Sequence, residues 1–133
     1  MKKQRTILIA EVDRNVARKI KRHFEMHDYY IYPILTTGDD LLVQSKILQP
    51  SLIIADTRLN GTIDGIEAIS RLEQEINIPY IFITRFDDDI RLIKSYYLKP
   101  VCLIQNPINL MNLNVSSDRV GVNFKYSESY HTV

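Results

Sequence analysis

The sequence predicts an α/β fold built on a five-stranded parallel sheet. Three observations support this: five short apolar runs, helical periodicity in most of the segments between them, and a length of 133 residues that suits one domain. Hydrophobic residues make up 45% of the chain and charged residues 25%, which is ordinary globular usage and argues against disorder. Strands that alternate with helices form parallel sheets joined by right-handed crossovers.

The first half of the chain supplies three strands and two helices. Val16, Ile20 and Phe24 recur at steps of four, which predicts an amphipathic helix, and Asp13 is available as its N-cap. Pro33 places the second strand at an edge of the sheet, because proline cannot donate to a central ladder. The strands are expected at 6–10, 29–35 and 51–55, and the helices at 13–27 and 36–49.

The second half continues the alternation. Ile66, Ile69, Leu72 and Ile76 form one apolar stripe, as in a helix packed on a sheet. Five strand–helix units fit a doubly wound sheet of order 2-1-3-4-5, a flavodoxin-like three-layer sandwich. The helices are expected at 65–76 and 87–98, and the strands at 79–84 and 101–105.

The tail is less regular than the rest. We expect residues 1–110 to form the main domain and 111–133 an irregular segment packed on it or extending from it. The tail is rich in asparagine, so a long final helix is poorly supported. A short helix from Leu110 is expected, followed by an extended or hairpin segment in which apolar and polar residues alternate between 119 and 126.

Charge and cysteine content limit the function classes. Lys and Arg number 17 against 16 Asp and Glu, a net charge of +1, so we expect neither nucleic acid nor a membrane as partner. Cys102 is the single cysteine, so no internal disulfide is expected. The first apolar run ends at Glu11, too early for a signal peptide or a membrane span, which predicts a cytoplasmic protein.

Acidic side chains end two strands that the predicted order makes neighbours. Asp56 closes the apolar run 52–55, while Glu11 and Asp13 follow the first strand. In such sheets a ligand binds outside the carboxyl ends of the strands, where the winding direction reverses. Clustered carboxylates suit Mg²⁺, and Thr84, at the end of the fourth strand, could donate to a bound oxygen. The alternative is that Asp13 and Asp56 merely cap the segments that follow them.

The motifs ILIAEVD, PSLIIADTRLNGTIDGIEAI, IFIT and CLIQNP resemble the receiver domains of two-component response regulators, in order over residues 6 to 110. The resemblance implies that Asp56 accepts a phosphoryl group from a histidine kinase or phosphotransfer protein, with Mg²⁺. It also implies that Glu11 belongs to the acidic pocket, that the Arg58 backbone carbonyl faces the metal, and that Thr84 is the switch hydroxyl.

Several positions depart from the family pattern. Val12 stands where a second adjacent acid is usual, and Asp13 either caps the next helix, the favoured interpretation, or reaches the ion. Asn106 occupies the place of the family's lysine, and it can donate a hydrogen bond but brings no charge. Either Arg85 or Arg58 stands in for that lysine, or both lie in solvent. Leu103 replaces an aromatic residue that usually couples to the switch hydroxyl.

Two functions therefore remain open, and an enzyme is not expected. The first is a phosphorylatable receiver domain, and the second is a pseudo-receiver that docks partner proteins whatever the state of Asp56. No nucleotide-binding loop with the Gly-x-x-x-x-Gly-Lys spacing is present. Tyr96, Tyr97 and Leu98 could form an apolar patch beside the fifth strand, the face through which family members often dimerise.

Overall fold

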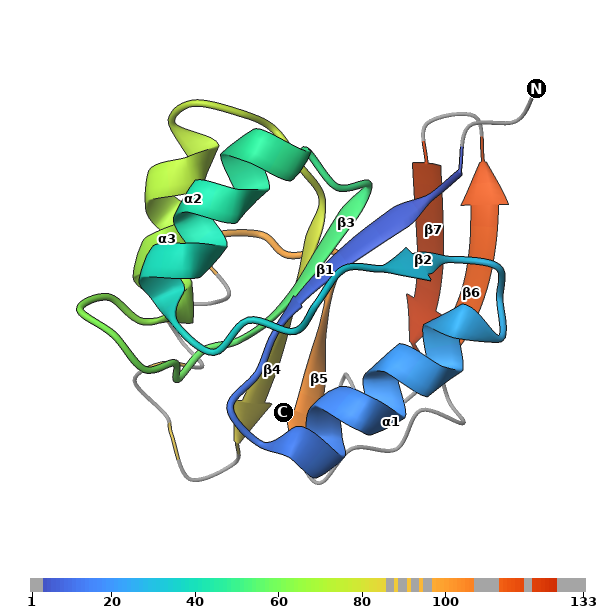
Figure 1. Cartoon of the computed structure of the whole chain (residues 1–133), viewed down its shortest axis with the longest axis horizontal. Helices are drawn as coiled ribbons and strands as arrows, with labels where there is room; N and C mark the ends of the chain where they lie inside the picture. The colour runs from blue at the N-terminus through green and yellow to red at the C-terminus, as the bar shows by residue number, and fades with distance from the viewer. Residues whose placement is uncertain are drawn as a thin grey trace.

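A computed structural model describes residues 4–85, 88, 91, 94, 97–106, 113–118 and 121–126. Its main feature is a five-stranded, all-parallel sheet in the order β2-β1-β3-β4-β5, which confirms the predicted order (Figure 1). The strands are β1 (Thr6–Ala10), β2 (Tyr30–Ile31), β3 (Leu52–Asp56), β4 (Tyr80–Arg85) and β5 (Cys102–Asn106). The winding direction reverses between β1 and β3, as the sequence predicts.

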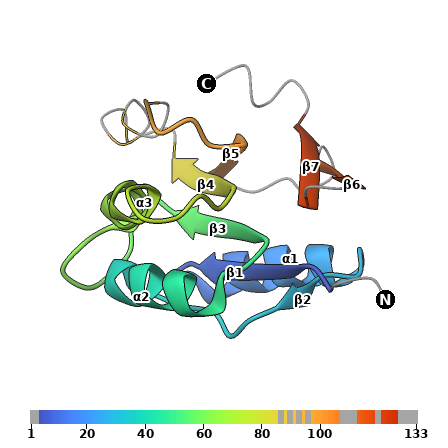
Figure 2. The ribbon, with the colours of Figure 1, turned by 90° about the horizontal axis from the view of Figure 1, so that it is seen from above.

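Helices cover both faces of this sheet. α1 (Arg14–Glu25) lies on one side, and α2 (Gly38–Leu48) and α3 (Gly65–Glu73) lie together on the other (Figures 1 and 2). Val16, Ile20 and Phe24 of α1 pack on one apolar cluster, which includes alternate residues of all five strands. The remaining alternate residues of β1, β3, β4 and β5 pack against α2 and α3. All five residues of β3 are buried, because the strand is covered on both faces.

The ends of the elements follow local chemistry. Asp13 caps α1 as expected, and Asp64 caps α3 by accepting a bond from the Glu67 amide. α3 ends at Glu73, so the predicted helix was too long, and half-buried Ile76 lies beyond it. β3, β4 and β5 each run one residue further toward the functional edge than predicted.

The second strand was predicted wrongly as a continuous run over 29–35. Only Tyr30 and Ile31 form β2, and contact with β1 resumes as an isolated bridge between Leu35 and Ala10. The Tyr32 amide donates to the Ile7 carbonyl at 3.1 Å, and the next amide to donate to β1 is that of Leu35, to the Ile9 carbonyl at 2.9 Å. A regular strand would use every second amide, so the ladder is interrupted by one extra residue in the segment that contains Pro33. Its position on an edge strand was predicted correctly.

The remaining segments are described only in part. Most of the predicted helix over 87–98 and the predicted helix from Leu110 lie outside the described residues. The tail contains an antiparallel pair, β6 (Leu113–Asp118) and β7 (Gly121–Tyr126), which agrees with the alternation predicted there. No helix in the described part of the chain is long and apolar enough to cross a membrane.

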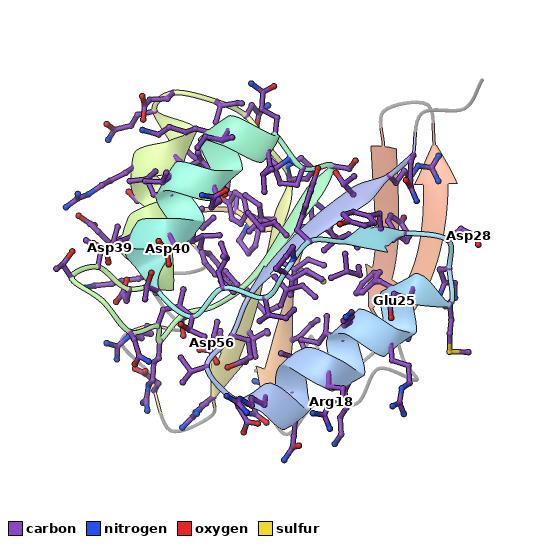
Figure 3. All side chains as sticks on the ribbon, in the orientation of Figure 1. Arg18, Glu25, Asp28, Asp39, Asp40 and Asp56 are labelled. Atoms are coloured by element: carbon purple, nitrogen blue, oxygen red, sulfur yellow. The ribbon has the colours of Figure 1, made fainter. Side chains whose placement is uncertain are left out.

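The loop that follows β3 is tied to the segment that precedes α2. The Asn60 amide donates to the Thr36 carbonyl at 3.0 Å, and the Gly38 amide donates to the Asn60 carbonyl at 3.1 Å. Asp39, labelled at the start of α2 in Figure 3, accepts bonds from the Thr62 amide and hydroxyl. These bonds fix the β2 side of the loop that begins at Asp56.

Candidate functional site

Two buried carboxylates meet at the carboxyl ends of β1 and β3. Ala10 and Ala55 are register partners, so Glu11 and Asp56, which follow them, lie opposite each other. Each is 2% exposed. Figure 3 shows Asp56 at the end of β3, close to the start of α1. The structure therefore brings together the two acids that the sequence predicted to share a pocket.

The two carboxyl groups interact strongly enough to share a proton. Burial, and then the charge of the neighbouring Asp56, raise the pKa of Glu11 to about 8. The Asp13 amide donates to Oε2 of Glu11 at 3.1 Å, whereas Oε1 is buried without a protein partner among the described residues. At neutral pH Glu11 therefore holds a proton, and the pair carries about one negative charge.

Asp56 is the member of the pair that is better stabilised in its ionised form. Burial raises its pKa, but three interactions oppose the rise: the hydrogen bond from the Arg58 amide, and the charges of Arg85 and Arg58. The Arg58 amide donates to Oδ1 of Asp56 at 2.8 Å. Because these interactions favour the anion, Asp56 is the carboxylate available as a nucleophile.

Thr84 is buried near this pair. It follows Ile83, which is the register partner of Asp56 on the adjacent strand, and its side chain lies at the carboxyl end of β4. Thr84 is 1% exposed, and its hydroxyl has no partner among the described residues. A buried hydroxyl without a partner is costly, so its presence here is typical of a site completed by a ligand.

Neither Asp13 nor Val12 adds a third carboxylate to the acidic pocket. Oδ1 of Asp13 accepts bonds from the amides of Asn15 at 2.9 Å and Val16 at 3.3 Å, so Asp13 is engaged as the cap of α1. This agrees with the favoured interpretation rather than with a place beside a metal. Val12 is 42% exposed and offers no ligand atom.

The two arginines differ in their surroundings. Nε of Arg58 pairs with Oδ2 of Asp88 at 2.6 Å, so the expectation that both arginines lie in solvent is wrong for Arg58. Arg85 is exposed at the end of β4, and its Cα is the register partner of Asn106. Leu103 is fully buried in the cluster against α2 and α3.

Sequence reasoning missed the role of Asp88. Oδ1 of Asp88 accepts from the Arg91 amide at 3.3 Å, as an acid near the start of the predicted helix over 87–98 would do. Its Oδ2 also accepts from Arg58 and Arg91, and Arg91 reaches Asp64 at 3.5 Å. These ion pairs connect the loop after β3 with the segment after β4, on the side of the pocket opposite to β2.

A groove that the sequence did not predict opens beside Glu11. Its volume is about 410 Å³. The apolar part of its lining is Val12, Ala17 and Ile34, and three cations of α1 line it as well: Arg14, Arg18 and Lys21. Figure 3 shows Arg18 on this helix. A partner that approaches the acidic pair from this side therefore meets positive charge.

The donor set fits a magnesium ion that keeps part of its water shell. Among the described residues, no group of three histidine, cysteine, aspartate or glutamate side chains could hold a metal. Two carboxylates are present, however, and the buried Oε1 of Glu11 has no protein partner. Mg²⁺ is commonly held by one or two carboxylates together with waters and substrate phosphate oxygens.

Comparison with known proteins identifies the family. A model described as the response regulator receiver domain matches residues 7–115. The chain belongs to this family. Receiver domains are signalling modules of two-component systems, and the acidic pair at the end of β1 and β3 lies where the resemblance places the family's site.

Three solved structures with the same fold illustrate how far the sequences can differ. The signal receiver domain of a modulated diguanylate cyclase from Desulfovibrio desulfuricans is 25% identical, with a TM-score of 0.73 over 80% of this chain and 85% of that one. A DNA-binding response regulator of the LuxR family from Staphylococcus aureus is 18% identical, with a TM-score of 0.71 over 80% and 89%. The BeF3-activated receiver domain of Klebsiella pneumoniae RstA is 23% identical, with a TM-score of 0.68 over 78% and 87%.

Proposed function

We propose that this receiver domain accepts a phosphoryl group on Asp56 from a histidine kinase or a phosphotransfer protein. The observation that carries the proposal is the buried pair of Glu11 and Asp56, in which Oε1 of Glu11 and the hydroxyl of nearby Thr84 both have no protein partner among the described residues. A phosphoryl group on Asp56, with its associated ion, would give partners to both atoms.

The transfer follows from the charges of the pocket. One oxygen of ionised Asp56 forms a bond to phosphorus as the bond between phosphorus and the donor nitrogen breaks. The electron pair of the broken bond goes to that nitrogen, and the imidazole of the donor histidine leaves as a neutral ring because its other nitrogen carries a proton. The Arg58 amide, which donates to Oδ1, holds the carboxylate in place. The Thr84 hydroxyl would then donate to a phosphoryl oxygen.

Glu11, Asp56 and the backbone carbonyl of Arg58 would hold Mg²⁺. When bound, the ion supplies positive charge toward the phosphoryl oxygens and stabilises the ionised form of Glu11. With Val12 in place of a further acid, we expect this ion to bind weakly. Asp13 supports the site indirectly. Its side chain caps α1, and its amide donates a hydrogen bond to the Glu11 carboxylate.

The partner would approach over the groove beside α1. Arg14, Arg18 and Lys21 line this groove next to Glu11, so a donor protein with an acidic surface would be attracted to it. Tyr97 is exposed, so its ring is available for contact with a second copy of the chain through the patch beside β5. Tyr96, which was expected in the same patch, lies outside the described residues.

Phosphoramidate, a small phosphodonor, tests the proposal without a partner protein. We expect the wild-type chain to gain the mass of one phosphoryl group in the presence of Mg²⁺, and Asp56→Asn to gain none. Asp28→Asn is a matched control, because Asp28 is exposed and has a φ of 66°, a backbone conformation that asparagine adopts well. Beryllofluoride with Mg²⁺ should shift the amide NMR signals around residues 56 and 84 in the wild type alone.

The second candidate function is a docking module that needs no phosphorylation. The exposed Val12 and the uncharged Asn106 favour it, because each removes a charge that the family's chemistry uses. A chain that stays unmodified by phosphoramidate and unchanged by beryllofluoride, while remaining folded, would leave this function in place of the first.

A further inference from the structure

We propose that the guanidinium of Arg85 binds the phosphoryl group on Asp56 and takes over the task that a lysine at the end of β5 performs elsewhere in the family. This inference rests on the proposed function and assigns one further residue to it. Nothing in the resemblance assigns Arg85 a role, because the family usually has a small residue there.

Strand register places Arg85 beside the vacant lysine position. The Cα atoms of Arg85 and Asn106 are register partners at the carboxyl edge of β4 and β5. Neighbouring strands lie about 4.8 Å apart, which the long side chain of arginine easily spans. The positive charge that a lysine would supply from β5 is therefore present on the adjacent strand, at the register position directly opposite Asn106.

Arg85 also lies on the same face of the sheet as Asp56, the face covered by α1. Ile83 is the register partner of Asp56. Both Ile83 and Ile54, which precedes Asp56 by two residues on the same strand, pack in the cluster beneath α1. Side chains of a strand alternate between faces, so residue 85 shares a face with residue 83. The charge of Arg85 already acts on Asp56, and it lowers the pKa of that carboxyl.

Arg85 is more available than Arg58, the other cation near Asp56. Arg58 pairs with Asp88, whose side chain is 9% exposed, and Asp88 is held in turn by Arg91. Moving Arg58 onto a phosphoryl group would leave part of the buried Asp88 charge uncompensated, which is costly. Among the described residues, no ion pair involves Arg85, and its side chain is exposed.

The chemistry of the guanidinium suits a phosphoryl group. Its planar fork donates two parallel hydrogen bonds to phosphate oxygens, and it stays charged at every relevant pH. Asn106 can add one neutral bond beside it. The site would then stabilise the transferring group from β4 and β5 together, with the charge on β4.

Exchanging the two positions tests the proposal. The initial rate of phosphorylation by phosphoramidate is measured by intact mass for Arg85→Gln, Arg85→Lys, Asn106→Lys and the double variant Arg85→Gln/Asn106→Lys. We expect Arg85→Gln to slow the reaction about tenfold and the double variant to recover to within about threefold of the wild type. Arg22→Gln, which removes an exposed arginine of α1, is the control and should change the rate less than about threefold.

Mg²⁺ affinity distinguishes a direct role of the Arg85 charge from a purely structural role. Removing a cation from beside Asp56 should tighten Mg²⁺ binding while it slows phosphorylation, whereas a folding defect would weaken both. The proposal is overturned if folded Arg85→Gln reacts at the wild-type rate, or if Asn106→Lys fails to restore the rate of the folded Arg85→Gln variant. A wild-type chain that accepts no phosphoryl group refutes the proposed function itself, and this inference with it.

Discussion

Replacing Glu11 with glutamine should remove most of the fall in stability that this domain undergoes as the pH rises. Burial, and then the adjacent Asp56, raise the pKa of Glu11 from 4.5 to about 8. The folded state therefore binds more protons than the unfolded state between these two values. Consequently the contribution of Glu11 to the free energy of unfolding is greatest below pH 4.5, falls as the pH rises through this range, and stays low above about 8.

The magnitude follows from the size of the pKa difference. Each pH unit corresponds to about 1.4 kcal/mol, so the rise from 4.5 to about 8 sets a ceiling of about 5 kcal/mol. Because the two carboxyls titrate as a coupled pair, we expect about 2–3 kcal/mol. His23 acts in the opposite direction, since burial and the nearby His27 lower its pKa. The informative quantity is therefore the difference between two proteins that both keep His23.

Urea unfolding followed by circular dichroism, without Mg²⁺, measures that difference between about pH 5 and pH 9. Glu11→Gln should match the wild type near pH 5, where Glu11 is protonated, and exceed it by about 2–3 kcal/mol near pH 8.5. Glu25→Gln, at the exposed end of α1, is the control and should follow the wild type throughout. Parallel curves for Glu11→Gln and the wild type would refute the argument that burial and Asp56 keep this carboxyl protonated.

Three further substitutions test separate parts of the structure. Gly65→Ala should cost about 2 kcal/mol or more in thermal unfolding, because its Cβ would collide with the Asp56 carbonyl; an unchanged midpoint would contradict that close approach. Tyr80→Phe should cost about 1–2 kcal/mol, because it leaves the Leu98 carbonyl without the Tyr80 hydroxyl, and a neutral result would argue against that bond. Arg18→Glu should slow phosphorylation by a phosphorylated donor protein about three- to tenfold at low salt and leave the phosphoramidate rate unchanged; equal effects on both would exclude a docking role for the groove.

The sheet order and the position of the acidic pair could be predicted from local patterns. The stripe of Val16, Ile20 and Phe24 determines which face of α1 is buried, and the apolar run before Asp56 determines that β3 is central. Once β1 and β3 are neighbours, their terminal acids must lie together. The cap at Asp13 was also predictable, because an N-cap bond joins residues two and three positions apart.

Contacts between distant residues could not be predicted in this way. Arg58 and Asp88 are separated by 30 positions, and their ion pair depends on how two loops meet above the sheet. The same holds for Arg85, whose effect on Asp56 requires the register between strands. The interruption of the second strand depends on how the chain on each side of Pro33 meets β1, which the presence of a proline alone does not specify.

The loop that carries Arg58 is attached differently along its two margins. On the side of Gly38 it is held by backbone amides and carbonyls, whose strength hardly depends on ionic strength. On the side of Asp88 it is held by charged side chains, which dissolved ions weaken. A new negative charge at the base of this loop, or a more concentrated salt solution, would therefore displace one margin and leave the other fixed. The margin near Asp88 is therefore the one that can move, while the margin near Gly38 keeps its place beside α2.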